Sequence, residues 1–277
     1  MQRTTKKTTL MLGLTSLLSI SLVSCSQGNE IEPSLENRQG LLTLTLSPNT
    51  DFSESTRAVN EANYEDTDKY TVRVIDKDGI ERLNCKGSEL AQKMPITMSI
   101  GGYTVEAFYG NESEASRNDF YVYGKEEGTI KSEGKENVNV VCAPTCGRIT
   151  VDFEEGMSTY FADYNVVFTG TEALGSKTIA WLKDDTEPWY VKLKEGNRGE
   201  TINFTITTTT KPEYLNENSE QIDTKTGSFS LSRNKAYKMI IKPRYTPSTS
   251  GEVQVDINII EDTNDKEYDI DVPVDWV

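Results

Sequence analysis

The sequence has no histidine, four cysteines in 277 residues, and fewer basic than acidic side chains. Without histidine the chain cannot form a Ser-His-Asp or Cys-His nucleophile pair or a His-ligated zinc or iron site. It also has no glycine-rich phosphate loop and no nucleophile elbow. The 29 Lys and Arg residues against 44 Asp and Glu residues give a net charge of −15, whereas nucleic-acid binders carry clustered basic surface. We therefore expect no enzyme, no cofactor, no metal site and no nucleic-acid partner.

The first 24 residues have the pattern of an export signal. Three basic residues precede an apolar stretch over 10–23, which is too short and too rich in Ser and Thr to span a membrane as a helix. The stretch leads into Leu22-Val23-Ser24-Cys25, which resembles the bacterial lipobox. Residues 1–24 are thus interpreted as a lipoprotein signal peptide and Cys25 as the lipidated residue. The alternative is an ordinary secretory signal followed by a cysteine by chance.

The residues after Cys25 indicate how the protein is held at a membrane. Residues 25–39 are acidic and contain Pro and Gly, which predicts a flexible tether. Removal of the basic signal leaves 26 basic against 44 acidic side chains, so the body is kept off an anionic membrane surface. Acidic residues soon after the cysteine also resemble a surface-export signal of Bacteroidetes lipoproteins. We expect lipid anchoring in the outer membrane, with the body facing the cell exterior and the periplasmic face as the alternative.

The other three cysteines, Cys85, Cys142 and Cys146, allow at most one intramolecular disulfide. An extended i,i+4 pair is roughly 13 Å apart, so Cys142 and Cys146 can pair only if the chain turns at Pro144. Three thiols with no fourth Cys or His are too few for a zinc site. Buried or unpaired cysteines are the interpretation that we favour, and the pairing stays open.

Alternation of apolar and polar residues dominates the chain and is typical of strands with one buried face. Alternating stretches lie at 42–46, 70–75, 103–107, 138–142, 149–153, 164–168, 202–206, 253–259 and 270–276. The segment Asp76-Lys77-Asp78-Gly79 indicates a hairpin turn, and residues 88–94, stopped by Pro95, indicate one short helix. No segment carries a helical apolar stripe over three turns. The sequence therefore predicts an all-β fold.

The number of candidate strands, about fifteen, exceeds what one seven-stranded sandwich holds. We expect two antiparallel β-sandwich domains in tandem. The Pro and Gly punctuation of Cys142-Ala-Pro-Thr-Cys-Gly147 gives the boundary. The N-terminal sandwich would cover 40–145 and the C-terminal sandwich 146–277.

Several short motifs together resemble fimbrillin-like surface lipoproteins of Bacteroidetes, in an adhesion and fimbrial branch. They are the early strand 40–46, the segment Ser55-Thr56-Arg57-Ala58, a G-x-Y-x-x-x-A-x-x-G strand at 101–110, and the pair of strands 138–142 and 147–153 at the crossover. The resemblance implies fimbrillin/transthyretin-like sandwiches. It also implies a structural or adhesive role at the cell surface, with other fimbrillin-like subunits as partners.

The same resemblance implies an assembly mechanism. In that family, cleavage after an arginine removes the first strand, and a strand of another subunit fills the groove by β-augmentation. Here the strand would be 41–46 and the cleaved bond Arg57-Ala58. The alternative is that Arg57 is an ordinary loop arginine and the strand stays in its sheet. The closing segment 269–277 could donate a strand to a neighbour, or could be an ordinary final strand at a sheet edge, where Pro273 is tolerated.

A second hypothesis is a glycan-binding surface lipoprotein that does not polymerise. Trp181, Trp189 and Tyr190 flank a polar loop, and aromatic rings around such a loop could stack on sugar rings of a glycan or host surface ligand. The alternative is that the tryptophans pack in the core. The acidic pairs 154–155 and 184–185 are interpreted as solvated surface, and the acidic segment 261–267 as a hairpin loop rather than a calcium site. Polymer subunit, cap, anchor and stand-alone adhesin are not separated by these patterns.

Overall fold

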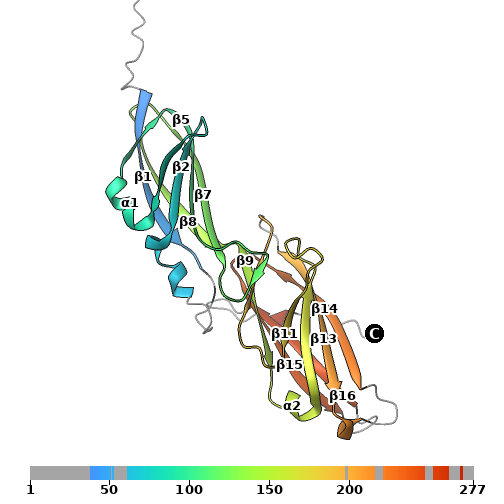
Figure 1. Ribbon diagram of the computed structural model, residues 1–277. Coiled ribbons are helices and arrows are strands. Elements are labelled where there is room, and N and C mark those ends of the chain that lie inside the picture. The colour runs from blue at the N-terminus through green and yellow to red at the C-terminus, as the bar shows by residue number, and fades with distance from the viewer. Residues whose placement is uncertain are drawn as a thin grey trace, which may run out of the picture.

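The structure is a computed structural model that describes residues 38–50, 52, 61–196, 199–215, 221–246, 252–261 and 269–270. Within these residues the chain is all-β with several sheets and few helical turns, as the alternation predicts. The strands form two groups that follow one another along an elongated molecule (Figure 1). The proposed signal peptide, Cys25 and the Arg57-Ala58 bond lie outside the described residues.

The strands account for most of this part of the chain. In chain order they are β1 (Gln39–Pro48), β2 (Thr71–Asp76), β3 (Glu81–Lys86), β4 (Ile96–Ser99), β5 (Gly101–Gly110), β6 (Ala115–Ser116), β7 (Tyr121–Ile130), β8 (Lys135–Pro144), β9 (Cys146–Phe153), β10 (Phe161–Thr169), β11 (Ile179–Leu182), β12 (Trp189–Lys192), β13 (Glu200–Thr210), β14 (Ile222–Leu231), β15 (Ala236–Thr246), β16 (Glu252–Glu261) and β17 (Asp269–Ile270). Two short α-helices, α1 (Gly87–Lys93) and α2 (Met157–Tyr160), and the 3₁₀ turns η2 (Glu61–Tyr64), η3 (Thr67–Lys69) and η4 (Pro212–Tyr214) connect them.

Local chemistry explains the β2–β3 hairpin. Asp76 ends β2, and its Oδ1 accepts hydrogen bonds from the backbone N–H groups of Asp78 and Ile80, both at 2.9 Å. Gly79 has a φ of 77°, in the left-handed region that a side chain disfavours. Arg82 Nε then donates to Asp76 Oδ2 at 2.6 Å. The predicted turn is confirmed, as is the predicted short helix, which the structure places at α1.

The first group of strands encloses one core. Seven strands are joined in the order β3-β2-β5-β7-β8-β1-β4, but β7 and β8 pair through only two residue pairs, so the sheet folds over at that corner. The buried residues of both layers meet in a single cluster, which includes Leu42, Val74, Val105, Val122 and Val140. We refer to residues 38–145 as the first half of the protein.

Strand β1 lies between β8 and β4 in this sheet. It runs parallel to β8 over eight residue pairs, from Leu41 to Pro48, and antiparallel to β4 over four pairs at its beginning. Leu42 and Leu44 are 0% and 4% exposed, so β1 forms part of the core. Gly40 has no room for a side chain, because a Cβ there would lie 2.7 Å from the carbonyl oxygen of Gly134.

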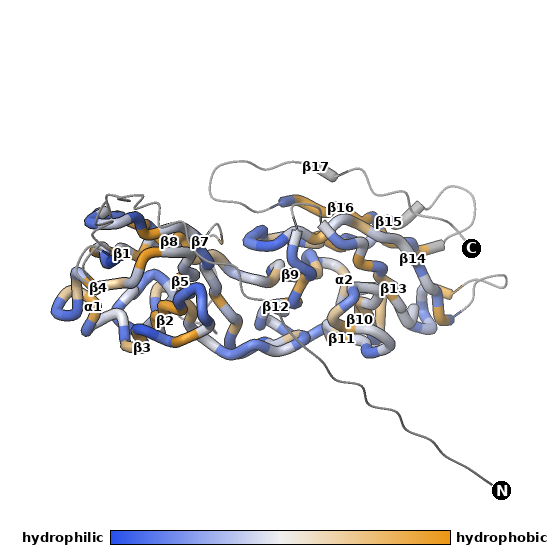
Figure 2. The backbone as a smooth tube through the Cα atoms, turned by 90° about the horizontal axis from the view of Figure 1, so that it is seen from above, coloured by the Kyte–Doolittle hydropathy of each residue, from blue (hydrophilic) through white to orange (hydrophobic). Residues whose placement is uncertain are grey.

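The second half, residues 146–270, has its own core between two sheets. One sheet has the order β11-β10-β13-β14 and the other β17-β16-β15-β9-β12-β6 (Figures 1 and 2). The cluster between them includes Ile149, Phe168, Phe204 and Ile241. Strand β14 pairs with β13 on one side only, and its Lys225 side chain is buried on the inner face beside the core.

The expectation of purely antiparallel sheets is wrong in two places. Besides β1 and β8, strands β9 and β15 pair in parallel through six residue pairs. Alternation along one strand cannot reveal this, because it reports which face is buried and not the direction of the neighbouring strand.

The three cysteines of the described chain, Cys85, Cys142 and Cys146, are all buried and none of them forms a disulfide, as favoured from the sequence. Burial raises the pKa of the Cys142 thiol to about 12. No helix among the described residues has the length and apolar character needed to cross a membrane.

Candidate functional site

The two halves meet in a junction to which the connection between β5 and β7 contributes a strand and several side chains. This connection, residues 111–120, includes β6, which pairs with β12 as Ser116 with Tyr190 and Ala115 with Val191. A strand from the first half thus completes a sheet of the second half. Lys192 N–H also donates to the carbonyl oxygen of Glu114 at 3.0 Å, so backbone hydrogen bonds hold the halves together.

Arg117, one residue after β6, is bound by the second half. Its Nη1 donates to the carbonyl oxygen of Glu187 at 2.5 Å, and its Nη2 donates to the carbonyl oxygen of Ala180 at 2.8 Å and to Asp185 Oδ2 at 2.5 Å. The guanidinium carbon lies 5.1 Å from the ring centroid of Trp181 and 4.5 Å from that of Trp189. Planar hydrogen bonding combined with stacking on aromatic rings is the arrangement that suits arginine and that lysine cannot reproduce.

Ion pairs surround this contact. Lys192 Nζ lies 2.7 Å from Glu112 Oε1, and Lys177 pairs with Glu114. These side chains are largely exposed, so their contribution to stability is small. They add charge complementarity to a junction that Arg117 and the backbone pairing hold.

A column of aromatic rings fills the centre of the junction. Phe120 stacks on Tyr64 with 3.7 Å between ring centroids and on Tyr190 of the second half with 4.8 Å. The Tyr64 hydroxyl accepts a hydrogen bond from the Phe120 N–H at 3.2 Å. Burial raises the pKa of Tyr64, which keeps the phenol neutral within the column.

The chain that leaves β1 also enters the junction. Asn49 N–H donates to the carbonyl oxygen of Cys142 at 2.8 Å, and Asn234 Nδ2 of the second half donates to the carbonyl oxygen of Asn49 at 2.9 Å. Phe52 is 4% exposed, and its ring centroid lies 5.4 Å from that of Phe120 and 5.8 Å from that of Tyr190. The end of β1 is thus fastened to both halves.

The structure corrects the prediction that Trp181, Trp189 and Tyr190 could stack on a sugar. Trp181 is 1% exposed and Tyr190 is 2% exposed, so neither ring has a face open to a ligand. Trp189 is partly buried, and its Nε1 donates to the carbonyl oxygen of Ala180 at 2.9 Å. The three residues do lie together, but their partners are Arg117 and Phe120 of the same chain. Core packing, the alternative from the sequence, is the correct interpretation.

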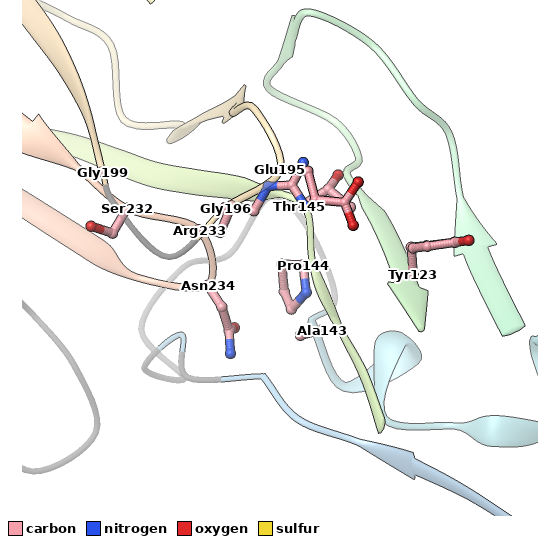
Figure 3. A pocket seen from close by; sticks show the side chains of 10 residues that line it. All are labelled: Tyr123, Ala143, Pro144, Thr145, Glu195, Gly196, Gly199, Ser232, Arg233 and Asn234. Carbon is pink, nitrogen blue, oxygen red and sulfur yellow. The ribbon is translucent and has the colours of Figure 1, made fainter. Parts of the chain in front are cut away.

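A pocket of about 540 Å³ opens on the junction, between Tyr123 of the first half and residues 232–234 of the second (Figure 3). Several of its polar side chains are bound within the protein. The Tyr123 hydroxyl donates to Glu106 Oε1 at 2.9 Å, and Arg233 Nε and Nη2 both donate to the carbonyl oxygen of Leu193, at 2.9 and 2.6 Å. We therefore interpret the pocket as a crevice between the two halves and not as a ligand-binding site.

A polar network on the outer face of the first half ends at this crevice. Glu106 binds Arg73 Nη2 at 2.5 Å as well as the Tyr123 hydroxyl. Burial alone would raise the pKa of Glu106, but these hydrogen bonds lower it overall, so the carboxylate stays ionised. Among the described residues no three His, Cys, Asp or Glu side chains gather in a way that could hold a metal ion.

Sequence reasoning singled out Trp181, Trp189 and Tyr190 of the junction but not the residues that they contact. Arg117 and Phe120 stand in a polar connection and carry no periodic signal. Phe52 was likewise an isolated aromatic residue between polar neighbours. An isolated aromatic residue of this kind suggests that its side chain is buried against a distant segment. Which segment that is follows only from the tertiary structure.

A family model described as "Domain of unknown function (DUF4493)" matches residues 38–274. A search of curated proteins found no match.

Among solved structures, similar ones include a fimbrial assembly protein from Parabacteroides distasonis, with 12% identity, a TM-score of 0.42, and coverage of 86% of this chain and 98% of that protein. The fimbrial anchor protein Mfa2 from Porphyromonas gingivalis has 12% identity, a TM-score of 0.37, and coverage of 81% and 97%. A candidate adhesin from Bacteroides ovatus has 10% identity, a TM-score of 0.44, and coverage of 84% and 96%. These three proteins are described as fimbrial or adhesion proteins.

Proposed function

The chain belongs to the family described as "Domain of unknown function (DUF4493)", and from this premise we propose that it is a lipid-anchored, cell-surface component of a fimbrium-like structure. In this proposal the protein joins other subunits by β-strand addition and has a structural or adhesive role, not an enzymatic one. Its body would consist of two sandwiches in tandem, 40–145 and 146–277. The two separate cores support that division.

The observation that carries the proposal is the setting of β1. This strand pairs with β8 on one side and with the short β4 on the other, and it places Leu42 and Leu44 in the core. Its departure would leave unpaired backbone groups along β8 and apolar pockets at alternate positions. A vacated position of this kind is what an added strand from another subunit recognises.

Anchoring and release form the second part of the proposal. Residues 1–24 would be removed as a signal peptide, and the lipid on Cys25 would anchor the protein in the outer membrane. Residues 25–39 would be the flexible tether between this anchor and the body. Cleavage between Arg57 and Ala58 would separate β1 from the rest of the chain. The closing segment 269–277 is the candidate strand that this protein offers to a neighbour.

Glycan binding through Trp181, Trp189 and Tyr190 is not part of the proposal. These side chains are engaged with Arg117 and Phe120 inside the protein.

N-terminal sequencing of the protein from its native cells, with and without an Arg-specific protease, tests the proposal. We expect a lipidated Cys25 in the precursor and a new terminus at Ala58 in multimers that resist mild denaturation. The matched control is Arg57→Lys, which keeps the charge but is not a substrate for the protease. An intact terminus at Cys25 on a monomer would contradict the strand-addition subunit and would leave a monomeric adhesin or anchor.

A further inference from the structure

Three aromatic rings stand on the outer face of the first half, on the neighbouring strands β5 and β7 (Figure 1). On β7 the buried Val122 stands between Tyr121 and Tyr123. On β5 the buried Ala107 precedes Phe108. Since successive side chains of a strand point to opposite faces, the three rings point away from the core. They are partly exposed and pack against neither core cluster, so core packing does not explain them.

The three rings are neighbours of one another. The ring centroids of Phe108 and Tyr121 are 6.1 Å apart, and those of Tyr121 and Tyr123 are 6.2 Å apart. Both separations fall in the range of interacting aromatic pairs. Tyr121 thus contacts both of the others, and together the rings offer a row of apolar surface on the outside of the sheet.

Polar groups in fixed positions border this row. Glu106 lies on the same face of β5, two residues before Phe108. Its carboxylate accepts hydrogen bonds from the Tyr123 hydroxyl at 2.9 Å and from Arg73 Nη2 at 2.5 Å. The Arg73 guanidinium carbon in turn lies 5.9 Å from the centroid of the Phe108 ring. These contacts hold the side chains in place, so a ligand has less side-chain freedom to remove when it binds.

The charges on this face are balanced. Arg73 forms an ion pair with Glu106, and Lys125 Nζ, on β7, lies 2.6 Å from Glu127 Oε1. A phosphate or sulfate group is recognised by cations that are available to it, whereas these two are already paired with carboxylates. The charge of the face therefore matches an uncharged ligand.

A neutral sugar chain has the chemistry that these groups require. A pyranose ring has a face of C–H groups, which stacks on an aromatic ring, and hydroxyl groups at its edge, which both donate and accept hydrogen bonds. The Glu106 carboxylate only accepts and the Arg73 guanidinium only donates, so a hydroxyl group can bond to either. A proline-rich peptide also stacks on aromatic rings, but its prolines have no N–H group to offer to Glu106.

We propose that the outer face of β5 and β7 binds a neutral polysaccharide, whose sugar rings stack on Phe108, Tyr121 and Tyr123 and whose hydroxyl groups bond to Glu106 and Arg73. This inference goes beyond the proposed function and does not depend on strand addition. The crevice that Tyr123 also borders is not part of the site, which lies across the open face of the sheet.

The test uses residues 26–277 and measures retardation of the protein in native gels that each contain one soluble polysaccharide. The neutral probes are a β-glucan, a mannan, an arabinoxylan and a levan, and dextran sulfate is the anionic probe. A proline-rich peptide is titrated separately and followed by tyrosine and tryptophan fluorescence. The variants are Tyr121→Ala, Tyr121→Phe and Phe108→Ala. Leu182→Ala is the matched control, because it removes an exposed apolar side chain, 55% exposed, from the second half. Thermal unfolding midpoints establish that each variant is folded.

We expect at least one neutral polysaccharide to retard the wild-type protein. Tyr121→Ala and Phe108→Ala should each raise the dissociation constant about tenfold, because each removes one stacking surface. Tyr121→Phe, which keeps the ring, and Leu182→Ala should bind as the wild type does.

Three results would overturn the inference. They are retardation of the folded alanine variants equal to that of the wild type, retardation by dextran sulfate or binding of the peptide without retardation by any neutral polysaccharide, and no binding of any probe. None of them bears on cleavage at Arg57 or on strand addition, which N-terminal sequencing tests separately.

Discussion

Arg117 of the first half lies against Trp189 of the second, with 4.5 Å between the guanidinium carbon and the ring centroid. The same guanidinium donates to Glu187, Ala180 and Asp185, all in the second half. A single side chain thus satisfies two backbone carbonyl groups and one carboxylate across the junction. The two halves are therefore joined directly, and we expect a substitution at the junction to lower the stability of both.

Replacement of Arg117 tests how far this contact stabilises the protein. We expect Arg117→Ala to lower the free energy of unfolding by about 2–4 kcal/mol. The Glu187 carbonyl loses this donor, the Ala180 carbonyl and Asp185 keep the Trp189 Nε1 and Leu182 N–H donors, and the two indoles lose a stacked neighbour. Arg117→Lys should recover little, since an ammonium group cannot bond in a planar fork. Urea unfolding followed by tryptophan fluorescence measures both. Lys125→Ala, which removes an exposed ion pair with Glu127, is the control and should not move the midpoint. A lysine variant as stable as the wild type would show that only the charge matters.

Trp181 is expected to behave as a core residue. Trp181→Ala should destabilise the protein by about 3–5 kcal/mol, because a large buried side chain is removed and the surrounding core cannot collapse fully. Leu182→Ala is the matched control. The Leu182 side chain, next to Trp181 in the sequence, is 55% exposed, so its truncation should be nearly neutral. Thermal unfolding compares the two variants. Similar midpoints for both would contradict the burial of Trp181.

Gly40 and Gly102 give a matched pair in the sheet of the first half. Gly40→Val should destabilise the protein by about 1–3 kcal/mol, because its side chain would overlap the backbone near Gly134. At Gly102 a Cβ would have no neighbour closer than 3.9 Å, so Gly102→Val should be tolerated. Urea unfolding midpoints of the two variants decide the point. Equal effects would mean that the neighbours of β1 can move apart.

The hairpin at Asp76 should make stability depend on acid pH. The hydrogen bonds from Ile80, Arg82 and Asp78 hold the pKa of Asp76 below its usual value of 3.8. Since the folded pKa is the lower one, the stabilisation is fully present above the unfolded pKa and is lost as the pH falls through the folded pKa. Asp76→Asn should thus lower the urea midpoint at pH 7, and its curve should converge with that of the wild type as the pH falls through the folded pKa of Asp76, which lies below 3.8. In contrast, Asp78→Asn, at an exposed carboxylate, should show little difference at either pH. A constant gap for Asp76→Asn across this range would refute the ionic origin.

The thiols should be protected until the protein unfolds. Cys85, Cys142 and Cys146 are buried, and the pKa of Cys142 is raised to about 12 by burial, so almost no thiolate is present at neutral pH. In a chain without residues 1–25, a thiol-specific reagent should detect no thiol in the native state and three in guanidinium chloride. Rapid native-state reaction of any one thiol would show that its segment opens.

The strands were predictable because burial on one face imposes a two-residue period on the sequence. Eight of the nine alternating stretches correspond to β1, β2, β5, β8, β9, β10, β13 and β16, and the ninth, 270–276, lies almost wholly outside the described residues. The turn at Asp76 follows from local chemistry. The alternation of apolar and polar residues could not predict which distant segments are in contact. The pairing of Ser116 with Tyr190 and the binding of Arg117 join residues about seventy positions apart. Such contacts depend on tertiary packing, which a period along one strand does not encode.

The free edge of strand β14 affects whether copies of the protein at high local concentration aggregate. Its outer edge is ten residues long and carries no neighbouring strand among the described residues, and such an edge invites indiscriminate sheet-to-sheet aggregation. The inward Lys225 counters this, because a foreign strand docked there would sit beside a charge that the inner face holds with Asp223. The lysine therefore disfavours the addition of a foreign strand at this edge of the second half.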